Sequence, residues 1–386
     1  MTELTFRPAR LRADGAWLAD WWHTVDRWML GAVGLLFVLG LVLGLAASPP
    51  LADKNGLWTY HYVVRHVLFG VVALGTIVAV SATPLHLLRR AGIVIFAVFA
   101  VATALLPVLG TDFGKGAVRW YSLGFIGLQP SEFLKPAFVI LAAWLMAGAA
   151  ERGGPPGRLI SGMIAAGLSV LLALQPDFGQ AMLLLAVWAV MLFVSGAPLA
   201  LLIGLAGAVG AAGSAAYLNS SHFAGRINGY LAEEVDPNTQ LAYAQSAIRE
   251  GGLFGVGAAQ GSVKWTLPDA HTDFIIAVAA EEFGLLLTLA IIGIYLFIVL
   301  RALMRLLEER NMFIRLAGTG LAAAFALQAF INMSVAIRLL PAKGMTLPFI
   351  SYGGSSMVAA AMGVGALLAF TRARPQDPGA RLRDSL

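Results

Sequence analysis

Long apolar segments separated by polar connections occupy most of this chain of 386 residues. Runs such as 28–48, 63–81 and 93–109 have about the 20 residues that an α-helix needs to cross a hydrocarbon layer about 30 Å thick. The alternating pattern of barrel strands is absent from the sequence. We therefore predict an all-α polytopic membrane protein with about ten transmembrane helices, at residues 28–48, 61–81, 92–110, 131–149, 158–175, 178–195, 197–218, 274–300, 313–337 and 350–371.

One polar segment is far longer than the other connections. It covers residues 219–273, between the seventh and eighth predicted spans, and ends in the sequence L-P-D-A-H-T-D. Because loops on a rigid scaffold carry function disproportionately, we expect chemistry on a membrane-surface substrate there. Asp273, at the mouth of the eighth span, is the candidate catalytic residue. The alternative is that its side chain only caps that helix.

The composition agrees with a protein built for lipid. Hydrophobic residues make up 59% of the chain and charged residues 12%, compared with about 25% charged residues in soluble domains. The chain has no cysteine, which excludes disulfides and thiolate metal sites. Its net charge of +5 would permit nucleic-acid binding, but we do not expect it, because the basic residues sort by membrane side.

Ten spans place both termini on one face, and sixteen of the 26 lysine and arginine residues fall on that face. The positive-inside rule makes this face cytoplasmic, so residues 219–273 form an extracytoplasmic loop. We expect a protein of the cytoplasmic (inner) membrane with a membrane domain at 28–371 and cytoplasmic tails at 1–27 and 372–386. Tryptophans at helical spacing in Trp17–Trp28 predict an interfacial helix at the end of the first tail.

Short outer loops should hold few cations, yet Lys115 and Arg119 share one with Trp120. Glu132 and Lys135 lie three residues apart at the start of the fourth span, so they share a helix face and can form an ion pair. These charges either surround an anionic ligand group such as a pyrophosphate or form structural ion pairs. The residues alone leave both interpretations open.

Further candidates lie in the other outer segments. Asp177, in the tight turn between the fifth and sixth spans, either caps the next helix or contacts substrate. Gln245 and Ser246 could face a sugar from a short amphipathic helix at 243–249. The glycines of 251–257 match neither dinucleotide-binding nor P-loop spacing, which favours a close-packed or re-entrant turn over a phosphate cradle.

The metal chemistry of the chain is limited. His271 has acids nearby but no second histidine at ligand spacing, so we do not expect zinc. A divalent cation, Mg²⁺ or Mn²⁺, bridging Asp273 and substrate phosphates is compatible with the residues. We expect no organic cofactor.

Five motifs in this order resemble the SEDS family of cell-wall polymerases, the family of FtsW, RodA and SpoVE. They are K-G-x-x-R-W at 115–120, Q-P-S-E-x-x-K at 129–135, Q-P-D-x-G at 175–179, L-P-x-A-H-T-D-F at 267–274 and L-P-F-I-S-Y-G-G-S-S at 347–356. The resemblance covers nearly the whole chain. Ala270, Thr346 and Leu347 look more like FtsW members than RodA members, and Asp269 stands where glutamate is usual.

The resemblance implies a septal peptidoglycan glycosyltransferase that polymerises lipid II into glycan strands during cell division, with inversion and release of undecaprenyl pyrophosphate. It places Asp273 on the family's essential loop aspartate. The substrate cavity that it implies includes Lys115, Arg119, Trp120, Glu132, Lys135, His271, Thr272, Lys343, Ser351, Ser355 and Ser356.

The implied partners are the nascent glycan strand, an FtsI-like class B penicillin-binding transpeptidase and other divisome membrane proteins. A lipid II flippase and a scaffold that recruits a transpeptidase are the alternative functions.

Overall fold

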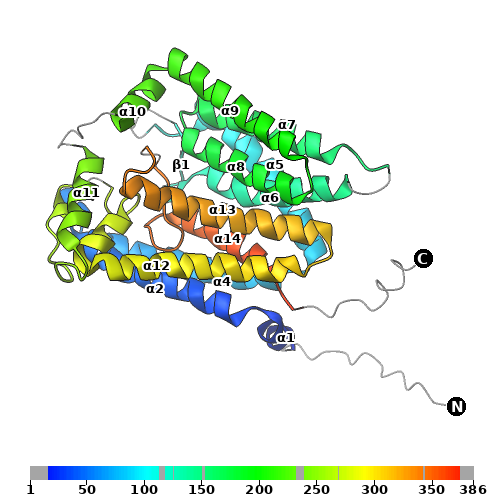
Figure 1. Ribbon diagram of the computed structural model, residues 1–386. Helices are drawn as coiled ribbons and strands as arrows, with labels where there is room; N and C mark the ends of the chain where they lie inside the picture. Colours follow the sequence, from blue (N-terminus) through cyan, green and yellow to red (C-terminus); the bar gives the residue numbers. More distant parts are fainter. Residues whose placement is uncertain are drawn as a thin grey trace.

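The computed structural model describes residues 16–112, 118–124, 126–149, 153–231, 239–267, 269–341 and 344–373. These residues form α-helices, one short 3-10 helix and one two-stranded hairpin (Figure 1). The predicted all-α fold class is therefore confirmed.

Ten helices form or flank the bundle in the described part of the chain. They are α2 (Arg27–Ala47), α4 (His61–Ala82), α5 (Leu85–Leu109), α6 (Pro130–Gly148), α7 (Gly157–Leu174), α8 (Phe178–Val194), α9 (Leu199–Asn219), α12 (Ile275–Leu307), α13 (Met312–Ala336) and α14 (Gly354–Phe370). They coincide with the ten predicted spans. The largest shifts are the start of α5, at Leu85 instead of 92, and the end of α12, at Leu307 instead of 300.

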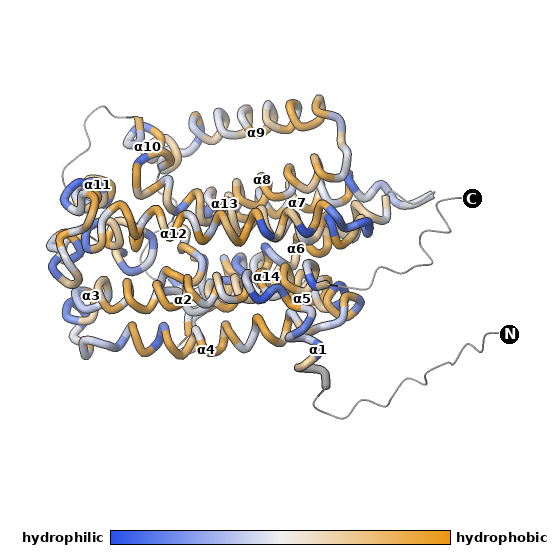
Figure 2. The backbone as a smooth tube through the Cα atoms, turned by 60° about the horizontal axis from the view of Figure 1, so that its bottom comes forward, coloured by the Kyte–Doolittle hydropathy of each residue, from blue (hydrophilic) through white to orange (hydrophobic). Residues whose placement is uncertain are grey.

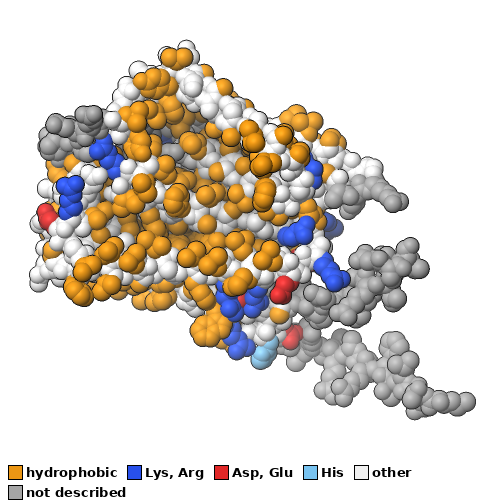
Figure 3. Space-filling model, in the orientation of Figure 1, with side chains coloured by type: hydrophobic (Ala, Val, Ile, Leu, Met, Phe, Trp, Pro, Cys, Tyr) orange, Lys and Arg blue, Asp and Glu red, His pale blue; other side chains and the backbone are white. Residues whose placement is uncertain are grey.

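Length and composition allow eight of these helices to cross a membrane, among the residues that the structure describes, and α8 and α14 are shorter apolar helices. The flank of the bundle is largely hydrophobic, whereas charged side chains gather at its two ends (Figure 3). Val71 of α4 and Val94 and Val98 of α5 are further examples of exposed hydrophobic side chains on the bundle helices. A soluble surface rarely exposes so large an apolar area, so this flank faces lipid and the chain is a multi-pass membrane protein.

The smaller elements lie at the two ends of the bundle. They are α1 (Ala16–Thr24), α3 (Pro49–Lys54), the antiparallel hairpin of β1 (Tyr121–Ser122) and β2 (Gly127–Leu128), α10 (Ser221–Leu231), α11 (Gln240–Gly251) and η1 (Val263–Trp265). Helix α1 lies at one end, and α3, α10 and α11 lie at the other (Figures 1 and 2). Helices were expected at the positions of α1 and α11, whereas the other elements were not predicted.

Helices α6 and α13 form the centre of the bundle, where 72% and 61% of their apolar windows are buried. Small residues allow the close contacts there. A Cβ on Gly320 of α13 would lie 2.6 Å from Val139 of α6, and one on Gly365 of α14 would lie 2.9 Å from Val80 of α4. Such positions let helix backbones approach in the absence of a hydrophobic driving force.

Helix α9 stands apart from the bundle (Figure 2), and none of its apolar window is buried. It is held at one end through α10. Arg338 Nη2 donates to Tyr230 O at 3.0 Å, and the Tyr230 hydroxyl donates to Leu339 O at 3.0 Å. The rings of Phe178 and Phe223 lie 4.9 Å apart at the same end.

A buried carboxylate ties the other end of the bundle together. Asp26 accepts from the first N–H groups of α2 and lies 2.7 Å from the Nε atoms of both Arg301 and Arg305 of α12. Nearby, Thr24 of α1 accepts from Arg372, which follows α14. These contacts join α1, α2, α12 and α14.

Replacing Asp26 tests this junction. We expect Asp26→Ala to lower the free energy of unfolding by about 2 kcal/mol, because it removes a helix cap and leaves two partly exposed arginines without their shared partner. Asp26→Asn keeps a capping oxygen and should lose less. Thermal unfolding in detergent measures both, with the exposed Asp53→Ala as control. Unchanged stability of Asp26→Ala would show that the junction contributes nothing.

Candidate functional site

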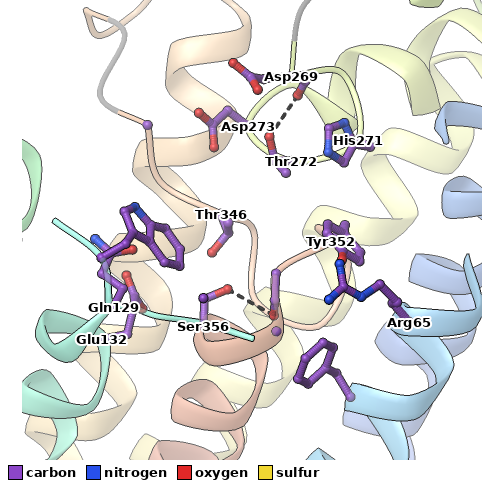
Figure 4. A pocket seen from close by; sticks show the side chains of 16 residues that line it. Arg65, Gln129, Glu132, Asp269, His271, Thr272, Asp273, Thr346, Tyr352 and Ser356 are labelled. Carbon is purple, nitrogen blue, oxygen red and sulfur yellow. Dashed lines mark hydrogen bonds between the residues drawn. The ribbon is translucent and has the colours of Figure 1, made fainter. Parts of the chain in front are cut away.

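A cavity of about 360 Å³ lies at the end of the bundle where α4, α6, α12 and α14 begin. Figure 4 shows Asp269 and Asp273 on one side of it, Gln129 and Glu132 on a second side, and Arg65 with Tyr352 on a third. The remaining wall comes from Phe69, Trp120, Gly127, His271, Thr272, Gly344, Thr346, Gly353, Gly354 and Ser356. Acids, a cation and aromatic rings therefore share one space.

The turn before α12 presents the first carboxylates. The backbone N–H groups of Thr272 and Asp273 donate to Asp269 O at 3.0 and 3.1 Å, and the Thr272 hydroxyl donates to the same oxygen at 3.1 Å. Asp269 has φ 56°, a left-handed conformation that aspartate tolerates better than most residues. The tight turn places both carboxylates at the cavity wall.

The loop before α14 forms the facing wall and is bonded to that turn. The Ser351 hydroxyl donates to Thr272 O at 2.5 Å and accepts from Leu347 N–H at 2.8 Å. The Tyr352 N–H donates to His271 O at 2.9 Å. Ser351 therefore joins two loops and does not belong to the cavity wall.

His271 is packed among aromatic rings. It is 8% exposed, and its ring centre lies 5.7 Å from those of both Tyr62 and Tyr352. Burial raises the pKa of Tyr352, and the charge of Arg65 opposes that shift. The rings fix the shape of the wall around Arg65.

Arg65 is the cavity residue that sequence reasoning missed as a site residue. It lies one turn into α4, next to an apolar run. An ionisable side chain at the edge of a span is a functional candidate by default, and that signal could have identified it. Gln129, Asp269 and Tyr352 also line the cavity and belong to motifs already singled out.

Glu132 and Lys135 form the predicted pair, with Nζ and Oε2 2.9 Å apart. Glu132 also accepts from Gln180 Nε2 at 2.6 Å, and Lys135 donates to Gln328 Oε1 at 2.9 Å. Both charged residues are buried, and of the two only Glu132 reaches the wall of the 360 Å³ cavity. The network thus joins α6, α8 and α13 behind that wall.

Arg119 and Asp177 lie in a second polar layer. Arg119 donates from Nε to Gln175 O at 3.0 Å and from Nη2 to Pro176 O, so it closes the turn between α7 and α8. Asp177 is 4% exposed, and its Oδ2 lies 3.5 Å from Nε2 of Gln129. Neither residue belongs to the wall of the 360 Å³ cavity.

Of the remaining candidate site residues from the sequence, one lines the cavity, three do not, and two lie outside the described residues. Gln245 is half-buried and Ser246 is exposed on α11, and neither lines the cavity. Ser356 lines it, whereas the Ser355 hydroxyl accepts from Gln129 N–H at 3.4 Å. Two predicted cations, Lys115 and Lys343, lie outside the described residues.

The glycine-rich segment at 251–257 packs against α12 as a close-packed turn, which confirms that interpretation. The N–H groups of Val256 and Gly257 donate to the carbonyls of Glu281 and Glu282 at 2.9 and 3.0 Å. A Cβ on Gly251 would lie 1.8 Å from Ala280 O. Close backbone approach therefore explains the glycines.

The side chains of Glu281 and Glu282 also bind the segment before α12, through Lys264 and Val263. Lys264 Nζ lies 2.5 Å from Glu282 Oε1, and Val263 N–H donates to Glu281 Oε1 at 2.8 Å. In the part of the chain that the structure describes, no three histidine, aspartate or glutamate side chains are grouped as metal ligands.

Comparison with known proteins identifies relatives along nearly the whole chain. The family model of the FtsW/RodA/SpoVE cell cycle proteins matches residues 26–376. A Caulobacter vibrioides protein named "Probable peptidoglycan glycosyltransferase FtsW" is 38% identical over 96% of this chain and 95% of its own length. A protein of the same name from Halorhodospira halophila is 36% identical over 90% of each chain. The expected similarity to FtsW members is confirmed.

Solved structures share the fold. A chain of a peptidoglycan synthase complex that coordinates polymerization and crosslinking has a TM-score of 0.74 and 26% identity, and the match covers 90% of this chain and 97% of that one. The rod shape determining protein RodA of Thermus thermophilus has a TM-score of 0.67 and 26% identity, with 92% and 99% covered.

Asp177 offers a test of the second polar layer. Burial raises the pKa of its carboxyl, although the charge of Arg119 opposes the shift. Ionisation above the unfolded pKa of about 4 therefore opposes folding. We expect Asp177→Asn to be at least as stable as the unchanged protein at pH 7, with a difference that shrinks as the pH falls toward about 4 and is lost below it, where the carboxyl is protonated in both states.

Melting temperatures in detergent between pH 4 and 8 measure this difference. The exposed Glu250→Gln should follow the unchanged protein at every pH. An Asp177→Asn protein that is less stable at pH 7 would mean that the ionised carboxylate stabilises the fold.

Proposed function

The chain belongs to the FtsW/RodA/SpoVE family of cell cycle proteins, and from this premise we propose that it is a peptidoglycan glycosyltransferase that polymerises lipid II. The proposal is supported most by one observation: Asp273 and Arg65 line the same 360 Å³ cavity from different sides. A carboxylate and a cation are the two groups that this reaction requires.

The chemistry follows from the leaving group. A hydroxyl of the acceptor sugar attacks the anomeric carbon of the donor, and the bond to the lipid diphosphate breaks with its electrons on the departing oxygen. A diphosphate leaves without being protonated, so it needs positive charge, whereas the attacking hydroxyl must lose its proton. One base is sufficient here, unlike the two carboxylates of glycoside hydrolysis. A single displacement inverts the α-linked donor to a β-linked product.

The residues have separate roles in this proposal. Asp273 accepts the proton of the acceptor hydroxyl, and Arg65 stabilises the departing diphosphate. Trp120, His271 and Tyr352 offer ring faces and edges against which sugars can pack. Glu132, held by Lys135, limits the cavity on the side of α6.

The cavity offers one set of ligands for a divalent cation. The cavity offers carboxylate oxygens from Asp269 and Asp273, and substrate phosphates and water would complete an oxygen shell. Such an ion would supply further positive charge for the leaving group.

The proposal also places the protein in the cell. We assign the end of the bundle that holds α1 to the cytoplasm, because sixteen of the 26 lysine and arginine residues belong to sequence segments expected on that side, and the cavity to the outer side of the cytoplasmic membrane. Similarity to FtsW members supports a place at the division septum among divisome membrane proteins. The related synthase complex supports a class B penicillin-binding protein as the transpeptidase partner.

Polymerisation of labelled lipid II by the purified protein with its partner tests the proposal. We expect glycan strands from the unchanged protein and a loss of more than about 100-fold in rate for Asp273→Ala and Asp273→Asn, because general base catalysis contributes about 10²–10⁴-fold. The exposed Glu250→Gln should polymerise normally.

Two outcomes would contradict the proposal. Full polymerisation by Asp273→Asn would remove Asp273 as the base. Transfer of lipid II across vesicle bilayers without any polymer would favour a flippase.

Arg65 is tested by the substrate dependence of the same reaction. We expect Arg65→Gln to raise KM for lipid II by about 10-fold or more, since a hydrogen bond to a charged group contributes about 1.5–3 kcal/mol. Arg65→Lys should recover part of the affinity, and the exposed Arg249→Gln serves as a matched control. An unchanged KM for Arg65→Gln would place the diphosphate elsewhere.

A further inference from the structure

Two amide side chains on one face of α13 contact the loops on either side of the cavity. Asn332 is 2% exposed, and its Nδ2 donates to Asp273 O at 3.0 Å and to Met345 O at 2.6 Å. Gln328, one turn earlier, donates from Nε2 to Thr346 O at 3.1 Å. Neither amide belongs to the wall of the 360 Å³ cavity, and the buried Asn332 is therefore not placed to touch a substrate bound there.

The carbonyls that Asn332 contacts lie in irregular backbone. The N–H of Ala277, in the first turn of α12, donates to Phe274 O at 2.9 Å. This N–H therefore does not pair with the carbonyl of Asp273, the residue before Phe274. Met345 lies in the loop before α14, outside any helix. A buried carbonyl without a partner costs about 1–3 kcal/mol. The two hydrogens of one amide group satisfy both carbonyls.

This contact sets the distance between two segments that meet at the carboxylate. A Cβ on Gly344 would lie 3.6 Å from Asp273 Oδ2, so the backbone next to Met345 borders the carboxylate itself. Because one nitrogen binds both Asp273 O and Met345 O, the backbones of these two residues cannot separate without breaking a hydrogen bond.

The part of α13 that carries Asn332 is itself held by buried contacts. Gln328 accepts from Lys135, which pairs with Glu132 at 2.9 Å. Helix α13 is also central in the bundle, with 61% of its apolar window buried. Asn332 therefore ties the backbone of Asp273 to the bundle core.

We infer that Asn332 is a positioning residue for the reaction: by binding the backbones of Asp273 and Met345 together, it holds the Asp273 carboxylate where the acceptor hydroxyl must arrive. The inference rests on the proposed function. Catalytic groups lose efficiency steeply with displacement, and an error of about 1 Å can cost about 100-fold in rate.

The test compares Asn332→Ala and the isosteric Asn332→Asp with the unchanged protein, in complex with its partner and with lipid II as substrate. Both substitutions remove the donated hydrogens, and the aspartate keeps the volume. We expect kcat to fall about 10–100-fold while KM for lipid II changes less than about 3-fold, because Arg65 and the rest of the wall remain.

The matched control is Asn311→Ala. Asn311 lies at the far end of the same helix, where it caps α13 by accepting from Phe313 and Ile314 N–H at 3.0 and 3.2 Å. Its loss should lower the melting temperature and leave kcat unchanged. The control therefore separates loss of stability from loss of position.

Three results would overturn the inference while the unchanged protein polymerises lipid II. They are a kcat within about 2-fold of the unchanged protein in both Asn332 variants, a loss of activity that only follows the fraction of folded protein, and a failure of both variants to fold. Absence of polymerisation by the unchanged protein would instead refute the proposed function, and this inference with it.

Discussion

The hydrogen bonds between the turn before α12 and the loop before α14 are the constraint on which the cavity depends. Each segment is irregular, and each carries side chains of the wall. The Ser351 hydroxyl, the Tyr352 N–H and the Asn332 side-chain amide donate to backbone carbonyls at this junction. In a water-poor environment such groups must be paired within the protein, so two loops that would be mobile in water are fixed in one arrangement.

The charged residues near the cavity differ in whether they line its wall. Arg119 binds backbone carbonyls of the α7–α8 turn, and Lys135 is committed to Glu132 and Gln328. Arg65 instead borders the cavity opposite Asp273 (Figure 4). For Lys135 the structure shows the structural ion pair, one of the two interpretations left open by the sequence, whereas the ligand site stays a prediction.

The sequence predicted the ten long helices because apolar length alone determines which segments can span a membrane. Three of the candidate residues that it offered, Asp273, Glu132 and Trp120, line one cavity. It could not predict that Ser351 binds backbone, since a small hydroxyl in a loop carries no signal of its partner. The two-residue strands of the hairpin are likewise too short to produce a periodic pattern.

A structure of the protein with a non-hydrolysable lipid II analogue and a short glycan acceptor tests the central claim most directly. The account predicts the acceptor hydroxyl within about 2.6–3.2 Å of the Asp273 carboxylate, with the diphosphate against Arg65. A diphosphate bound at the α7–α8 turn, or a glycan seated away from Asp273, would contradict it.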